Sequence, residues 1–144
     1  MTVIAWDGKT LAADRQTTIG DMIATRSKIH KLGDDLYFVG SGDTDRVLIM
    51  VEWVRNGCDP EKWPSFQRNQ DTWVRFVVAR DGKILEYNQE PMPIPCEDEK
   101  MAWGSGSSYA MGALMVGASA IEAVLATNKC CNTCGNGCDS VEVN

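Results

Sequence analysis

The chain has 144 residues, of which 44% are hydrophobic and 24% charged, as in an ordinary globular domain with a core of its own. Its formal net charge of -6 argues against nucleic acid or an anionic membrane as the main partner, because phosphate binding requires clustered lysines and arginines. No apolar run approaches the roughly 18 residues that span a bilayer. No basic segment followed by an apolar core opens the chain, so we expect a cytoplasmic protein with a single domain over residues 1–144.

Short antiparallel strands are predicted for the first part of the chain, because apolar runs alternate there with turn-forming residues. Asp7-Gly8 between two apolar runs is a strong hairpin signal. Further turns are expected at Gly20-Asp21 and at residues 33–35. The strands expected around these turns are residues 3–6, 9–13, 22–31 and 36–39. In this assignment Lys28 and His30 share one strand and one face, since side chains alternate along a strand.

The rest of the chain alternates helices with strands. A helix is expected from residue 44 to about residue 56, after a capping Asp43 or Thr44. Residues 58–72 are polar and predict a connection. The later expected elements are strands at 73–79 and 83–87, a stiff proline-rich connector at 91–95, a strand at 101–103, one helix or two broken near Gly117 at 110–127, and a strand at 140–143. This order predicts an α+β fold, with antiparallel sheets flanked by helices in a layered sandwich.

Thr2 follows Met1 directly, and its position suggests a catalytic role. If Met1 is removed, Thr2 carries a hydroxyl nucleophile and a free α-amine on one residue, which is the minimum apparatus of an N-terminal nucleophile (Ntn) hydrolase. An α-amine ordinarily has a pKa of about 8 and is partly neutral at physiological pH, so it can serve as the base. No side-chain base is then needed, which suits a chain with a single histidine.

Five segments, in order, resemble the proteasome β-type family, and within it the HslV branch of bacterial ATP-dependent proteases. They are Thr2–Ala5, Leu11–Asp14, Ser27–His30, Gly40–Gly42 and Gly104–Ser107. The resemblance is strong over residues 2–46, good over 102–113 and loose elsewhere. It implies an Ntn-hydrolase sandwich, shortened here because residues 58–72 leave no room for the family's long second helix. The late Asp of proteasomes is absent from residues 129–134, as it is in the HslV branch.

The resemblance also implies roles for individual residues. The catalytic set would be Thr2, Asp14, Lys28, Gly42 and Ser105: Lys28 and Asp14 pair beneath Thr2, the Gly42 N–H faces the oxyanion, and Ser105 positions the Thr2 amine. Further residues would contact substrate. Thr17 and Thr18 would border the cleft and pair with an extended peptide, while Arg26, Gly40 and Thr44 would line the first specificity pocket.

Four of the six cysteines lie within nine residues, at Cys130, Cys131, Cys134 and Cys138. Four thiolates close in sequence suggest a zinc or iron–sulfur site, although structural zinc sites usually use two separated pairs. Buried cysteines acting as small hydrophobic residues are the alternative. The resemblance implies instead that backbone carbonyls here, those of Asn128, Cys131 and Cys134, bind a monovalent cation such as Na+. No cofactor is otherwise expected.

The sequence thus favours a threonine endopeptidase acting on unfolded polypeptide inside homo-oligomeric rings, with an ATP-dependent unfoldase implied by resemblance alone. Two alternatives stay open. One is a catalytically inactive assembly protein of the same fold, forming rings or tubes, because a retained Met1 would bury the Thr2 amine in a peptide bond. The other is a small metal-binding module built on the cysteine cluster.

Overall fold

The computed structural model describes residues 1–144 and divides the chain into two compact units. The first unit comprises Met1–Ile29 and Glu97–Asn144, and the second comprises His30–Cys96. Each unit contains antiparallel strands and at least one helix packed against them. None of the helices is both long enough and apolar enough to cross a membrane.

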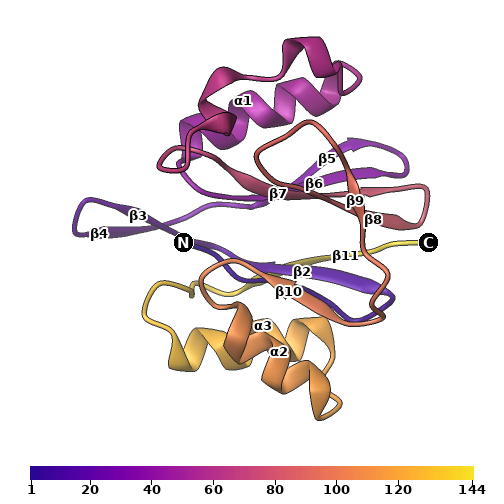
Figure 1. Cartoon of the computed structure of the whole chain (residues 1–144). Coiled ribbons are helices and arrows are strands. Elements are labelled where there is room, and N and C mark those ends of the chain that lie inside the picture. The colour runs from indigo at the N-terminus through magenta and orange to yellow at the C-terminus, as the bar shows by residue number, and fades with distance from the viewer. The chain divides into compact units, whose positions relative to one another are not determined.

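The first unit is built on a four-stranded antiparallel sheet in the order β10-β1-β2-β11. Its strands are β1 (Ile4–Trp6), β2 (Thr10–Asp14), β10 (Met101–Trp103) and β11 (Cys138–Glu142). Two helices, α2 (Ser107–Met115) and α3 (Ala120–Cys130), cover one face of this sheet (Figure 1). Small buried residues such as Ala5, Ala12 and Ala123 fill the interface, which lets the helices lie close to the strands. A separate hairpin pairs β3 (Gln16–Ile19) with β4 (Met22–Thr25).

The Asp7-Gly8 turn joins β1 to β2, as the sequence predicts. Asp7 Oδ1 accepts hydrogen bonds from the N–H groups of Lys9 at 3.0 Å and Thr10 at 2.7 Å, and Gly8 adopts a φ of 95° that favours glycine. Asp7 Oδ2 accepts the N–H of Ala120 at 2.9 Å, so the same carboxylate also holds the start of α3. Burial raises the pKa of Asp7, but the backbone hydrogen bonds from Ala120, Thr10 and Lys9 outweigh it and lower the pKa below its usual value.

The apolar region after residue 107 forms two helices, which resolves the choice that the sequence leaves open. Gly117 lies between them with a φ of 104°, a conformation that an L side chain rarely adopts. The second helix then begins with a capping box. The Glu122 N–H donates to the Ser119 hydroxyl, and the Ser119 N–H donates to the Glu122 carboxylate.

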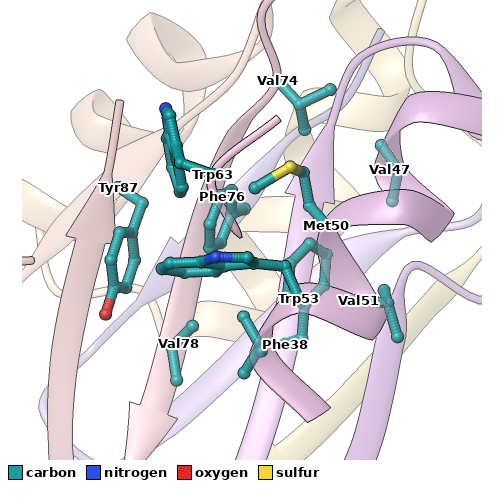
Figure 2. Packing of buried hydrophobic residues seen from close by; sticks show 11 residues of the cluster. Phe38, Val47, Met50, Val51, Trp53, Trp63, Val74, Phe76, Val78 and Tyr87 are labelled. Carbon is teal, nitrogen blue, oxygen red and sulfur yellow. The ribbon is translucent and has the colours of Figure 1, made fainter. Parts of the chain in front are cut away.

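The second unit contains a five-stranded antiparallel sheet in the order β5-β6-β7-β8-β9. Its strands are β5 (Ile29–Gly33), β6 (Leu36–Ser41), β7 (Arg75–Arg80), β8 (Lys83–Tyr87) and β9 (Ile94–Pro95). Helix α1 (Thr44–Arg55) begins at the cap Asp43 and packs on the sheet through Met50, Val51 and Trp53. Figure 2 shows the aromatic rings around Trp53; its centroid lies 4.7 Å from that of Trp63 and 5.5 Å from that of Tyr87.

Residues 58–72 contain no long helix, as the sequence predicts. They form two short 3-10 turns, Pro60–Lys62 and Ser65–Arg68. Gln67 is fully buried in this connection and bonds both backbone groups of Val74, donating to its carbonyl and accepting from its N–H. The polar side chain therefore replaces a strand partner for the residue that precedes β7.

One strand assignment is wrong. Residues 22–31 do not form a continuous strand, because β4 ends at Thr25 and β5 starts at Ile29. The three residues between the two strands are irregular. The Arg26 N–H donates to the Arg15 carbonyl at 2.8 Å, next to the last β3–β4 pair, and the Ser27 hydroxyl donates to the Ile29 carbonyl at 3.2 Å. Lys28 lies in this irregular segment outside any strand, so the argument that it shares a strand face with His30 fails.

Candidate active site

Thr2 lies immediately before β1 and is almost completely buried, with 3% of its surface exposed. Its carbonyl accepts the Gly106 N–H at 3.2 Å, and its own N–H donates to Ser105 Oγ at 3.2 Å. Gly104 passes so close that a side chain there would collide with the Thr2 carbonyl, and its φ of 95° also favours glycine. The segment after β10 therefore fixes the backbone of Thr2.

The Lys28 ammonium lies against the Thr2 hydroxyl. Its Nζ is 3.1 Å from Thr2 Oγ1, 2.8 Å from Asp14 Oδ1 and 2.8 Å from the Met1 carbonyl. These three acceptors match the three N–H groups of an ammonium. Only 10% of the Lys28 side chain is exposed, so its charge is poorly screened by water. A buried cation at this distance favours negative charge on the hydroxyl oxygen.

Asp14, at the end of β2, holds this lysine. Its carboxylate has no exposed surface and accepts four hydrogen bonds. Oδ1 receives Lys28 and the Val3 N–H at 3.1 Å, while Oδ2 receives the N–H groups of Gln16 at 3.3 Å and Gly135 at 3.1 Å. A carboxylate with both oxygens occupied in this way is a fixed anion that orients Lys28, and it has no free position from which to contact substrate.

Ser105 approaches Thr2 from the loop between β10 and α2. Its Oγ is 3.2 Å from the Thr2 nitrogen, 3.4 Å from the Thr2 carbonyl and 3.3 Å from Thr133 Oγ1. The structure thus brings together four residues that the sequence singles out, Thr2, Asp14, Lys28 and Ser105. It also adds Thr133 and Gly135, which sequence reasoning missed because nothing distinguishes a lone Thr or Gly within a cysteine-rich segment.

Comparison with known proteins shows which sequences and folds the chain resembles. No family model matches the chain. The chain is 34% identical over 133 residues to proteasome subunit beta 2 of Pyrococcus abyssi, an alignment that covers 78% of the chain and 64% of that relative. It superposes with a TM-score of 0.77 on BPH of Thiobacillus denitrificans, at 20% identity and over the full length of both chains, in a structure of the complex with epoxomicin. HslV from Trypanosoma brucei matches with a TM-score of 0.73 at 18% identity, over 98% of the chain and 97% of that protein.

The chain is therefore similar to the proteasome β-type/HslV family. Its fold is the α+β Ntn-hydrolase fold, with antiparallel sheets and helices, as the sequence predicts. The chain spans 64% of the length of the Pyrococcus relative.

Three further residues that the family resemblance selects belong to the second unit. Gly42 follows β6 with a φ of 144°, and a side chain there would contact Val74. Gly40 lies in β6, where an added Cβ would press on the Phe38 ring, and Thr44 is the first residue of α1. Close packing thus favours glycine at position 40, and the positive φ favours it at position 42. The oxyanion role of Gly42 and the pocket roles of Gly40 and Thr44 stay predictions.

The other substrate contacts expected in this family lie on or beside the β3–β4 hairpin. Thr17 pairs with Ala24 and is half-buried, whereas Thr18 pairs with Ile23 and is exposed. Arg26 follows the hairpin with an exposed side chain. The contact of these three residues with a peptide stays a prediction.

The cysteines do not form the metal-thiolate cluster that the sequence leaves open. Among residues 1–144, no three His, Cys, Asp or Glu side chains converge in a way that could hold a metal ion. Cys134 is buried whereas Cys130 is exposed, so their sulfurs belong to different environments. Burial raises the pKa of Cys134, with a contribution from Asp14, to about 11, and burial likewise raises the pKa of Cys138 to about 11. Both are held as thiols, which are poor metal ligands.

The predicted monovalent cation site involves carbonyls rather than thiolates. The Cys131 carbonyl accepts the Cys134 N–H at 3.3 Å, which leaves one of its lone pairs for another partner. Asn128 lies in the last turn of α3, and its side-chain amide donates to the Gly137 carbonyl at 3.0 Å. Binding of Na+ by the carbonyls of Asn128, Cys131 and Cys134 stays a prediction.

Proposed function

We propose that the chain is an N-terminal threonine endopeptidase in which Thr2, once Met1 has been removed, is the nucleophile. The observation that carries the proposal is the position of Lys28, whose ammonium is hydrogen-bonded to Thr2 Oγ1 and to the fully buried Asp14 at once. A surface threonine needs no such support. The similar fold of BPH, a protein whose structure was solved in complex with epoxomicin, also supports the proposal.

In the first step, Thr2 Oγ1 attacks the carbonyl carbon of a peptide bond and its proton passes to the Thr2 α-amine. The C–N bond breaks, the proton goes to the leaving amine, and an ester joins the substrate acyl group to Thr2. Water then attacks this ester with the amine again as base, which releases the acid and restores the hydroxyl. The Lys28 charge lowers the free energy of the developing alkoxide, and the predicted Gly42 N–H would stabilise the oxyanion by about 3 kcal/mol.

Removal of Met1 does more than free the amine. In the described chain the Met1 carbonyl accepts one of the Lys28 N–H groups, at 2.8 Å. Once Met1 is gone, Lys28 keeps two of its three partners and has one N–H available for the attacking oxygen or for water. The same event therefore creates the base and releases a hydrogen-bond donor beside the nucleophile.

Assembly and partners belong to this proposal as well. An isolated subunit would leave its nucleophile open to any chain, so an endopeptidase of this kind requires homo-oligomeric rings. We expect unfolded polypeptide as the substrate, an ATP-dependent unfoldase as the partner and the cytoplasm as the location.

The test is hydrolysis of short fluorogenic peptides by the unaltered chain, Thr2→Ala and Thr2→Ser. We expect Thr2→Ala to lose all activity above background while its circular dichroism and sedimentation stay unchanged. Thr2→Ser keeps a hydroxyl and an amine, so it should retain measurable turnover. If Thr2→Ala were as active as the unaltered chain, Thr2 could not be the nucleophile.

One alternative concerns Met1, whose carbonyl accepts a Lys28 N–H. While Met1 is attached, the Thr2 nitrogen is an amide and cannot accept a proton. A protein that keeps Met1 would be an inactive assembly subunit of the same fold. The mass of the mature chain distinguishes the two.

A further inference from the structure

A row of polar groups continues beyond Ser105, away from Thr2. Thr133 Oγ1 lies 3.3 Å from Ser105 Oγ and 3.0 Å from the sulfur of Cys131. The row thus runs from the Thr2 nitrogen through two hydroxyls to a thiol, with every link at 3.3 Å or less. In both of the outer links either atom can be the donor, so the direction of the row is not set by its geometry alone.

The proposed chemistry sets that direction. For the Thr2 amine to accept the proton of its own hydroxyl, its lone pair must face Oγ1, and an amine N–H must then donate elsewhere. Ser105 Oγ is placed to accept it. The Ser105 hydroxyl proton must in turn point away from the amine, towards the Thr2 carbonyl at 3.4 Å or towards Thr133 Oγ1 at 3.3 Å. Thr133 Oγ1 can accept it only if the Thr133 proton points at a further acceptor. The Cys131 sulfur is that acceptor.

We propose that Cys131 and Thr133 are positioning residues that orient the Ser105 hydroxyl so that the Thr2 amine keeps its lone pair for catalysis. This inference rests on the proposed function of Thr2. Without the sulfur, the Thr133 hydroxyl is free to donate to Ser105. The Ser105 hydroxyl then loses Thr133 as an acceptor, keeps only the Thr2 carbonyl and the amine lone pair within reach, and can donate to the lone pair. That hydrogen bond competes with the proton transfer on which the first step depends.

The backbone holds both positioning residues in place. The Cys131 N–H donates to the Thr127 carbonyl at 2.8 Å at the end of α3, and its carbonyl accepts the Cys134 N–H. Two residues beyond Thr133, the Gly135 N–H donates to the buried Asp14. The segment that carries the row is therefore anchored at one end to the helix and at the other to the carboxylate that holds Lys28.

The test measures kcat and KM for peptide hydrolysis, together with the rate at which an epoxyketone forms an adduct on Thr2. The variants are Cys131→Ala, Thr133→Val and the double variant, with Cys131→Ser and Thr133→Ser as conservative replacements. Cys130→Ala is the matched control, because Cys130 is the exposed neighbour of Cys131. The thermal midpoint of each variant reports any loss of folding.

We expect Cys131→Ala and Thr133→Val each to lower kcat and the adduct rate about three- to tenfold, the effect of one lost hydrogen bond, with KM unchanged. The double variant should be no slower than the slower single variant, since both changes interrupt one row. Both serine variants should recover to within about twofold of the unaltered rate, and Cys130→Ala should match it.

Three results would overturn the inference. One is an unchanged adduct rate in both Cys131→Ala and Thr133→Val while the unaltered chain reacts at Thr2, which leaves the proposed function standing. Another is a multiplicative loss in the double variant, which indicates two independent packing defects. The third is no adduct on the unaltered, Met1-free chain, which removes the proposed function and this inference with it.

Discussion

Replacing Lys28 by Met tests the buried ion pair that organises the site. The side chain of Lys28 is 10% exposed and that of Asp14 is not exposed at all, so the change leaves a carboxylate in the interior without its cation. Removing one partner of a buried pair costs about 3–5 kcal/mol. Asp14 keeps the N–H groups of Val3, Gln16 and Gly135, which favours the lower end of that range.

We therefore expect the free energy of unfolding to fall by about 3 kcal/mol near neutral pH, which corresponds to a thermal midpoint about 6–12 °C lower for a chain of this size. Urea unfolding measures the first quantity, and it is valid if the slope with urea concentration stays the same as in the unaltered chain. Peptide hydrolysis should be lost as well, because the cation beside Thr2 Oγ1 is gone.

Arg68→Met is the matched control. Arg68 forms an ion pair with Glu90 at 3.3 Å, but the two side chains are 55% and 62% exposed. An exposed pair contributes under about 1 kcal/mol, so this variant should unfold almost as the unaltered chain does. If Lys28→Met costs no more than Arg68→Met, the reasoning about the buried pair is refuted.

Three further changes test other parts of the structure. Gly104→Ala places a methyl group against the Thr2 carbonyl and should reduce peptide hydrolysis strongly, while Gly112→Ala, in open space on α2, should not; equal rates would contradict the close approach. Asp7 has a lowered folded pKa, so its contribution to stability is complete above its unfolded value of 3.8 and is lost as the pH falls through the folded pKa. As the pH falls below 3.8 and through the folded pKa, the difference in urea midpoint between the unaltered chain and Asp7→Asn should shrink. A difference that stays constant over this pH range would argue against a lowered pKa for Asp7. Gln67→Leu leaves the N–H and carbonyl of Val74, the residue before β7, without these partners, at roughly 1–3 kcal/mol each. The exposed Gln70→Leu should change the unfolding free energy little.

The sequence predicts turns and helix ends correctly where the chemistry of one or two residues determines the backbone conformation. Asp7-Gly8 predicts its hairpin because the aspartate side chain bonds the turn and glycine permits the positive φ. Gly117 marks the break between α2 and α3 for the same reason. The four residues at Thr2 could be selected because each carries a distinctive chemical group and the motifs that contain them occur in the family's order.

Other features depend on contacts between distant parts of the chain. Arg26-Ser27-Lys28 contains no Gly, Pro, Asn or Asp, so nothing local predicts that the strand is interrupted there; the Arg26 N–H is bonded to the distant Arg15 carbonyl. Thr133 and Cys131 acquire their place beside Ser105 only because the segment after α3 is hydrogen-bonded to the loop after β10, which is distant in sequence. The spacing of the cysteines suggests a metal cluster, but in the fold Cys134 is buried whereas Cys130 is exposed, and no three potential ligands converge.

The central claim is that Thr2 is an N-terminal nucleophile, and intact mass tests it most directly. The chain, expressed with Met1-Thr2 at its start, is incubated with a threonine-directed epoxyketone and weighed. We predict a mass that lacks Met1 and carries one inhibitor, with peptide mapping that assigns the adduct to Thr2. A mass that retains Met1 and carries no inhibitor would contradict the claim and favour an inactive assembly protein of the same fold.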